Sequence, residues 1–181
     1  SKNGKNVFYD PKGTDGLSKL AWDFISRLLN HAPEMCLVMN SSVNSYRRLD
    51  PHFEAPNQIK VSAVDRGSMI RIPMGNEKTA RIELRSVGPD ANPYMVLFTM
   101  LKIGLEGEPL VKDETKRDRV RFLPDNMYDA LSVFKSSKFM AEVLGEEGKD
   151  KYAQFKQASA ERCPKELGTT VKSSEVWYHH E

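Results

Sequence analysis

The sequence predicts an α+β fold in which an antiparallel sheet is flanked by helices and followed by a helical C-terminal extension. Two features carry this prediction. Apolar residues recur at helical spacing near both ends, and short strand-like runs separated by tight turns lie between them. The chain has 181 residues, of which 39% are hydrophobic and 29% charged, a balance that suits a globular domain with its own core. Residues 1–110 are expected to hold the sheet and core helices, and residues 111–181 the extension.

The first elements are expected to be two helices and a long loop. A helix is predicted by one apolar stripe at helical spacing: Leu17, Leu20, Ala21, Phe24, Ile25, Leu28 and Leu29. A second helix is predicted over residues 34–39, because Pro33 suits a first helical turn. Residues 40–57 are expected to form a loop, and long loops inside a compact domain are usually functional.

Turn residues and the periodicity of apolar residues predict the sheet and the later helices. Strands are predicted over residues 59–64, 68–72 and 80–85. The short turns between them favour antiparallel hairpins. Pro93 opens a helix over residues 94–105, which is apolar on all sides and is therefore expected to be buried. Further helices are predicted after a charged connection, over residues 125–134, 136–144 and 148–160.

Composition excludes several classes of protein. A net charge of +2 argues against a general binder of nucleic acid or membrane surfaces. No apolar run approaches the roughly 20 residues that a membrane-spanning helix needs. Cys36 and Cys163 lie far apart, and with the four histidines they show no zinc-site spacing. We expect free thiols and a reducing, cytoplasmic location.

The run 81–85 (Arg-Ile-Glu-Leu-Arg) is the first candidate site. Alternation along a strand turns Ile82 and Leu84 toward the core and the charged side chains to the other face. With the preceding turn and strand, the sheet would present four cations: Arg66, Arg71, Arg81 and Arg85. Arginine binds phosphate and carboxylate with paired hydrogen bonds, and Glu83 could ligate Mg²⁺ or Mn²⁺. The alternative is an exposed sheet face whose charges pair with one another.

The loop 44–56 is the second candidate, since Arg48 and Glu54 could face a ligand together. A glutamate on a loop can accept a proton or belong to a lid. The alternative is a solvated loop with proline turns. Neither a GxxxxGK[ST] nor a GxGxxG pattern occurs, so phosphate cradles of those kinds are not supported. His31, at a helix end, suits a helix-terminus partner better than a ligand.

Several strings, in order, resemble the glutamine synthetase family. They are Asn44-Ser45-Tyr46-Arg47-Arg48-Leu49, Glu54-Ala55-Pro56, Asp65-Arg66-Gly67-Ser68, Ile70-Arg71-Ile72-Pro73, Arg81-Ile82-Glu83-Leu84-Arg85 and Asn92-Pro93-Tyr94. Their order and spacing match across residues 40–107, and weaker similarity covers nearly the whole chain. The resemblance implies the C-terminal part of the family's catalytic domain, with the histidine motif and the other metal-binding glutamates lying upstream.

The resemblance also implies an activity. The family consists of ATP-dependent glutamate–ammonia ligases, which join carbon to nitrogen through γ-glutamyl phosphate, use Mg²⁺ or Mn²⁺ and form ring-shaped homo-oligomers in the cytoplasm. By resemblance, the residue roles are glutamate binding for Arg48 and Arg85, catalysis for Glu54 and Arg66, phosphate binding for Arg66, Arg71, Lys78 and Arg81, and metal binding for Glu83. This chain alone is expected to be inactive. Two alternatives stay open: a related ligase for an amine other than ammonia, and a non-catalytic module for assembly or anion binding.

Two departures from the family pattern stand out. The usual Asn-Arg-Ser reads Asp65-Arg66-Gly67 here, which adds a negative charge beside a phosphate-binding arginine. The usual Pro-Asp after the Arg-x-Glu-x-Arg strand is displaced and occurs as Gly88-Pro89-Asp90.

Overall fold

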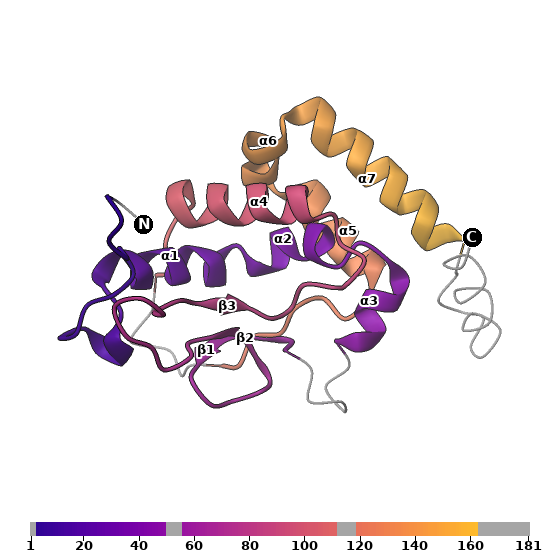
Figure 1. Ribbon diagram of the computed structural model, residues 1–181. Coiled ribbons are helices and arrows are strands. Elements are labelled where there is room, and N and C mark those ends of the chain that lie inside the picture. The colour runs from indigo at the N-terminus through magenta and orange to yellow at the C-terminus, as the bar shows by residue number, and fades with distance from the viewer. Residues whose placement is uncertain (1–2, 50–55, 112–118, 163–181) are drawn as a thin grey trace.

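The computed structural model describes residues 3–49, 56–111 and 119–162, and it confirms the α+β class (Figure 1). In chain order the elements are α1 (Lys19–Asn30), α2 (Ala32–Met39), α3 (Val43–Arg48), β1 (Gln58–Ser62), β2 (Ser68–Arg71), β3 (Glu83–Leu84), α4 (Pro93–Glu106), α5 (Met127–Ser136), α6 (Lys138–Leu144) and α7 (Glu146–Glu161). Figure 1 shows α4 stacked on α1 and α2, with the small sheet beneath them. Among the described residues, none of the helices combines the length and the hydropathy needed to span a bilayer.

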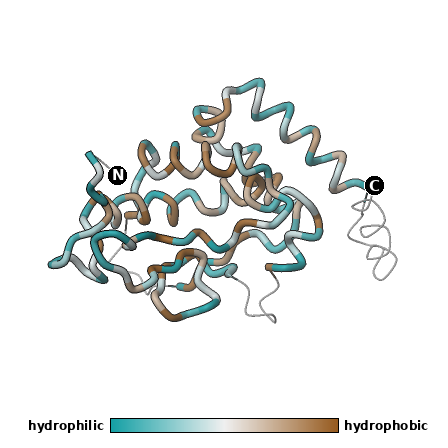
Figure 2. Tube along the Cα trace, in the orientation of Figure 1, coloured by the Kyte–Doolittle hydropathy of each residue, from teal (hydrophilic) through white to brown (hydrophobic). Residues whose placement is uncertain are grey.

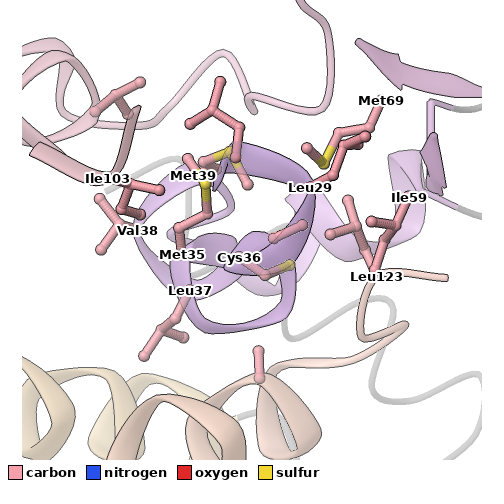
Figure 3. Packing of buried hydrophobic residues seen from close by; sticks show 14 of the residues in the cluster. Leu29, Met35, Cys36, Leu37, Val38, Met39, Ile59, Met69, Ile103 and Leu123 are labelled. Carbon is pink, nitrogen blue, oxygen red and sulfur yellow. The ribbon is translucent and has the colours of Figure 1, made fainter. Parts of the chain in front are cut away.

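Helix α2 lies at the centre of the core. It has no polar face, and the side chains from Met35 to Met39 are each at most 1% exposed. Figure 3 shows them extending in several directions, toward Ile103 of α4 and toward Met69 and Ile59 of the sheet. An apolar helix can avoid water only if it is covered all round, so the surrounding elements are packed onto α2. Figure 2 shows hydrophobic segments in these stacked helices and in the strands beneath, whereas α7 is predominantly hydrophilic.

The sheet is mixed, so the prediction of an all-antiparallel sheet is wrong. Its order is β1-β2-β3, with β2 and β3 antiparallel as expected but β1 and β2 parallel. The cause is the loop at 63–67, which curls back on itself. Ser62 Oγ accepts hydrogen bonds from the backbone N–H groups of Val64 (3.2 Å) and Asp65 (3.0 Å). The loop therefore returns the chain beside the start of β1, where Gln58 pairs with Ser68.

The free side of β1 is covered by residues 121–123, which run antiparallel to it. Ile59 N–H donates to the Arg121 carbonyl at 2.8 Å, and Leu123 N–H donates to the Asn57 carbonyl at 2.9 Å. These bonds satisfy backbone groups that an edge strand would otherwise present to other chains. They also attach the start of the C-terminal helical region to the sheet.

Two other predictions are corrected. Residues 40–57 are not one loop, because α3 occupies Val43–Arg48, with the Ser42 hydroxyl accepting from Ser45 N–H at its start. Helix α4 is not buried all round. Its inner side holds Val96, Thr99 and Ile103, whereas its outer side exposes a set of large apolar residues: Tyr94, Leu97, Phe98, Leu101 and Leu105. The predicted helices around 17–29, 34–39 and after 125 are confirmed with shifted bounds, although Leu20 is exposed.

His31 joins three parts of the helical layers. Glu108 N–H donates to His31 Nε2 at 3.1 Å, which leaves Nδ1 as the protonated nitrogen that donates to Glu34 Oε2, also at 3.1 Å. Ser137 Oγ donates to the same carboxylate oxygen at 2.7 Å. The histidine thus links the α1–α2 junction, the end of α4 and the α5–α6 junction, a structural role in line with its predicted place at a helix end.

The first prediction concerns the contact between α1 and α4. A Cβ on Gly104 would lie 2.2 Å from two ring carbons of Phe24, so we expect Gly104→Ala to lower the free energy of unfolding by about 1–3 kcal/mol through overpacking. The matched control is Gly148→Ala in α7, where the Cβ would meet only Leu144 Cβ at 3.9 Å. That change should stabilise the chain by about 0.5–1 kcal/mol. Urea denaturation of both variants is the measurement, and equal effects would contradict the close packing.

The second prediction concerns pH. Burial raises the pKa of Glu34, but hydrogen bonds from His31 and Ser137 outweigh it, so the pKa lies below the ordinary 4.5. A lowered folded-state pKa contributes stability that is present above 4.5 and is lost as the pH falls through the folded value. We expect Glu34→Gln to lower the free energy of unfolding by about 1 kcal/mol at neutral pH. The free energy of unfolding of this variant should also fall less steeply as the pH is lowered. Glu147→Gln, at an exposed ion pair, should change neither the free energy of unfolding at neutral pH nor its slope against pH.

Candidate functional site

Opposed charges meet where β2 and β3 lie side by side. Their antiparallel register places Arg71 directly opposite Glu83. Arg71 Nη1 lies 3.3 Å from Glu83 Oε2, and Arg81 Nη2 lies 2.7 Å from Glu83 Oε1. The carboxylate is therefore held between two arginines, and this triad keeps one excess positive charge at a partly exposed site.

The predicted strand is only partly formed, since β3 covers Glu83–Leu84 alone. The side chains of residues 81–84 nevertheless alternate between the two faces of the strand, as predicted. Ile82 and Leu84 pack against the core, whereas Arg81 and Glu83 bond to each other on the other side. The charged side of this short strand is thus available to a ligand.

The other predicted arginines are connected through main-chain carbonyls. Arg85 Nη1 donates to the Arg66 carbonyl at 2.7 Å, which fixes the exit of β3 to the loop before β2. Arg48, at the end of α3, donates from Nη2 to the Val87 carbonyl at 2.9 Å. The structure therefore brings the segments that carry Arg48, Arg66 and Arg85 together, with hydrogen bonds that an isolated surface arginine would not make.

Arg48 is a described arginine of this region whose pKa departs from its ordinary value. Burial lowers the pKa of Arg48, and Arg85 adds to the lowering, while Asp90 opposes it. Arg71, Arg81 and Glu83 form a charge cluster with one excess positive charge, and Arg85 connects β3 to the Arg66 segment through a main-chain hydrogen bond.

Asp65 does not cancel the charge of Arg66, although the two are adjacent in sequence. Its Oδ2 lies 2.6 Å from Lys60 Nζ, and its Oδ1 accepts from Gly67 N–H at 2.7 Å. The hydrogen bond from Lys60, followed by the one from Gly67, lowers the pKa of Asp65. The negative charge that Asp65 adds relative to the family pattern is thus paired within the loop itself, where the aspartate closes the turn.

Two predicted residues are not joined to this cluster. Lys78 lies in the turn at 76–79, where its N–H donates to Asn76 Oδ1 at 3.0 Å, and no described contact links its ammonium group to the arginines. Glu54 lies outside the described residues, as does Cys163. Cys36 is a free, fully buried thiol whose burial raises its pKa to about 12, so it is no nucleophile.

A metal site is not completed by this part of the chain. Glu83 supplies one carboxylate, and it is already paired with two arginines. Within the described ranges, no group of three or more acidic, histidine or cysteine side chains could hold a metal ion. Mg²⁺ usually takes one or two carboxylates with water and phosphate oxygens, so the residues present do not by themselves fit a bound ion.

Asp90 is a further residue of this region, which the sequence analysis named only within a departure from the family pattern. Asp90 lies beside Arg48 and lines a pocket of about 290 Å³ with Ser42, Asn44, Ser45, Arg48 and Pro89. The signal in the sequence was the displaced Gly-Pro-Asp, but a displaced motif does not say which element the carboxylate will contact.

Comparisons with known proteins show the family to which this chain is similar. Residues 1–174 match the family described as the catalytic domain of glutamine synthetase. The chain is 43% identical over 160 residues to a glutamine synthetase of Methanosarcina mazei, covering 80% of this chain and 36% of that protein. It is 37% identical over 171 residues to one of Thermus thermophilus, covering 86% and 38%.

Similarity in structure points the same way. A solved structure described as "Apo GmaS without ligand" superposes with a TM-score of 0.71 at 30% identity, covering 88% of this chain and 38% of that one. The protein belongs to the glutamine synthetase family and matches its catalytic domain. The chain spans well under half the length of the curated relatives it matches, 36% of the first and 39% of the second.

The third prediction tests whether the arginines form an anion site. Glu83→Gln removes the negative charge that Arg71 and Arg81 now share. We therefore expect tripolyphosphate, without divalent metal, to bind about two- to fivefold more tightly to this variant, the range for a partly exposed charge pair. Glu77→Gln, in the exposed turn before β3, is the control and should change the affinity little. Calorimetric titration is the measurement, and an unchanged affinity of Glu83→Gln would show that the arginines do not act as one site.

Proposed function

We propose that this chain supplies the C-terminal part of the catalytic domain of an ATP-dependent glutamate–ammonia ligase. The single observation that carries the proposal is the charge cluster on β2 and β3, with Glu83 between Arg71 and Arg81 and with Arg85 bonded to the Arg66 segment. Guanidinium groups suit phosphate and carboxylate oxygens. Both kinds of anion meet in a reaction that phosphorylates a carboxylate.

The reaction has two balanced steps. A glutamate γ-carboxylate oxygen attacks the γ-phosphorus of ATP, and ADP leaves with the electron pair of the broken bond. Ammonia then attacks the acyl carbon of γ-glutamyl phosphate, the bond from that carbon to the phosphate oxygen breaks, and the leaving phosphate takes up the proton that nitrogen loses as glutamine forms. Phosphoryl transfer depends mainly on positioning and charge neutralisation, so fixed arginines are the groups this step requires.

The roles proposed for the residues follow the resemblance of their motifs to the glutamine synthetase family. Arg48 and Arg85 bind glutamate from the α3 and β3 sides. Arg66, Arg71, Arg81 and Lys78 bind the ATP phosphates, and Arg66 also stabilises the transferring group. Glu54 shields the intermediate and accepts a proton from ammonium. Glu83 contributes one ligand to Mg²⁺ or Mn²⁺, whose chemistry would be to neutralise phosphate charge when the remaining ligands are supplied.

The whole protein is proposed to be a cytoplasmic, ring-shaped homo-oligomer, as in the family it resembles. Within it, residues 1–110 belong to the sheet and core helices of the catalytic domain and residues 111–181 to a helical extension. The chain spans 36–39% of the first relatives' length, so we propose that the 181 residues alone do not turn over substrate.

The fourth prediction concerns the polypeptide at the relatives' full length. Phosphate release should require ATP, glutamate and ammonium together. Arg66→Ala should lower kcat about 10- to 150-fold with little change in the KM for glutamate, because its charge matters most in the transition state. Arg48→Ala should instead raise the KM for glutamate, since the substrate carboxylate is charged throughout.

Lys151→Ala, in an exposed pair on α7, is the control and should leave kcat and KM unchanged. A panel of amines in place of ammonium separates glutamine formation from ligation to another amine. Turnover that does not depend on glutamate, or an Arg66→Ala variant that changes only glutamate affinity, would contradict the proposed roles.

A further inference from the structure

Lys156 of α7 is a buried lysine that reaches the junction between α2 and α3. It is 8% exposed, and its Nζ donates to the Ser41 carbonyl at 2.7 Å. The ammonium group also lies over two aromatic rings, 5.3 Å from the centroid of Tyr152 and 5.0 Å from that of Phe155. A buried charge is costly without partners, and these contacts offset part of that cost. Figure 1 shows the C-terminal end of α7 on the same side of the molecule as α3.

The α2–α3 junction is in turn bonded to the turn that follows β3. Ser41 Oγ donates to the Asp90 carbonyl at 3.1 Å, and Ser45 Oγ donates to Asp90 Oδ1 at 2.6 Å. Gly88 N–H donates to the Met39 carbonyl at 2.9 Å. A Cβ on Gly88 would lie 2.5 Å from Ser45 Oγ. The start of α3 and this turn are therefore packed too closely to shift independently.

Arg48 lies at the other end of α3. Its Nη2 donates to the Val87 carbonyl at 2.9 Å, which connects the end of the helix to the same stretch of chain after β3. A helix of six residues is about 9 Å long. Lys156 thus acts at one end of a short hydrogen-bonded unit, and Arg48 projects from the other end.

Asp90 also relates the two cations through its charge. Burial lowers the pKa of Lys156 and that of Arg48, and in both cases the charge of Asp90 opposes the lowering. One carboxylate therefore favours the charged form of both side chains. Loss of the Lys156 ammonium group would remove one positive charge from this group of three, so an anion at Arg48 would be attracted less.

A second buried lysine on the same helix makes the same kind of contact elsewhere. Lys149 is also 8% exposed, and its Nζ donates to the Ser137 carbonyl at 2.8 Å, at the junction of α5 and α6. This contact fixes α7 to the helical layers and not to α3. Lys149 therefore separates the general effect of a buried lysine on stability from an effect on Arg48.

We propose that Lys156 is a positioning residue of the candidate site: from α7 it holds the α2–α3 junction and, through α3, the guanidinium group of Arg48. The inference rests on the proposed function, in which Arg48 binds the glutamate substrate. It gives α7 a part in substrate affinity that the sequence analysis did not indicate.

The test is the KM for glutamate in the polypeptide at the relatives' full length. Lys156→Met keeps the length of the side chain but removes its charge and its hydrogen-bond donor. We expect the KM to rise about three- to tenfold, the range for a residue that acts through another, while kcat changes by less than about twofold. In an Arg48→Ala background, Lys156→Met should add no further rise, because a positioning residue acts through the residue that it positions.

Lys149→Met is the matched control. It also removes a buried ammonium group that donates to a main-chain carbonyl of a helix junction. It should therefore lower the urea midpoint about as much as Lys156→Met does, but it should leave the KM and kcat unchanged.

NMR of the 181-residue chain tests the positioning without turnover. In Lys156→Met, the signal of Arg48 Nε–H and the backbone amide signals of Ser45 and Ala91 should shift. In Lys149→Met, these signals should stay in place, whereas the amide signal of Met140, whose N–H donates to Ser137 Oγ, should shift.

Four results would overturn the inference: an unchanged KM for glutamate in Lys156→Met, an equal rise in Lys149→Met, a further rise in the Arg48→Ala background, or an unmoved Arg48 signal in Lys156→Met. The proposed function fails separately, through absent glutamate-dependent turnover in the full-length polypeptide. In that case, an Arg48 signal that shifts in Lys156→Met but not in Lys149→Met would still support the positioning of Arg48 by Lys156.

Discussion

The burial of α2 is the constraint on which the rest of this structure depends. A helix without a polar side loses hydrophobic stabilisation wherever it meets water. The sheet covers it on one side and α4 on another (Figure 3), and α5 packs on it as well. In β2 the neighbouring residues Met69 and Ile70 point to opposite faces, yet both are fully buried, so this strand is covered on both sides there. Arg71, at the end of β2, is exposed.

The site is a consequence of that arrangement. Once Ile82 and Leu84 pack against the core, Arg81 and Glu83 lie on the outer face, and the β2–β3 register brings Arg71 to them. The triad is exposed enough that its ion pairs add little to stability. Its charges are positioned by strand geometry rather than by their own attraction, which is how a binding site keeps charge available for a ligand.

The chain belongs to the glutamine synthetase family and matches its catalytic domain. It spans 36–39% of the first relatives' length, and its described residues offer guanidinium groups together with one carboxylate at the β2–β3 face. Arg48 and Arg85 also bond to the main chain at Val87 and Arg66, so these two side chains are held by the fold itself. Such preorganisation lowers the cost of ordering side chains when a ligand binds.

The sequence by itself determined the α+β class, the helices other than α3 and the identity of the charged residues, because these depend on local periodicity and on residue chemistry. It did not determine the parallel pairing of β1 with β2, which depends on hydrogen bonds inside the loop at 63–67. It also misjudged α4, since an apolar helix is buried all round only where neighbours cover every side. The contact of Asp90 with Ser45 arises between residues 45 positions apart. Only the tertiary structure decides such pairs, because packing and not local pattern brings them together.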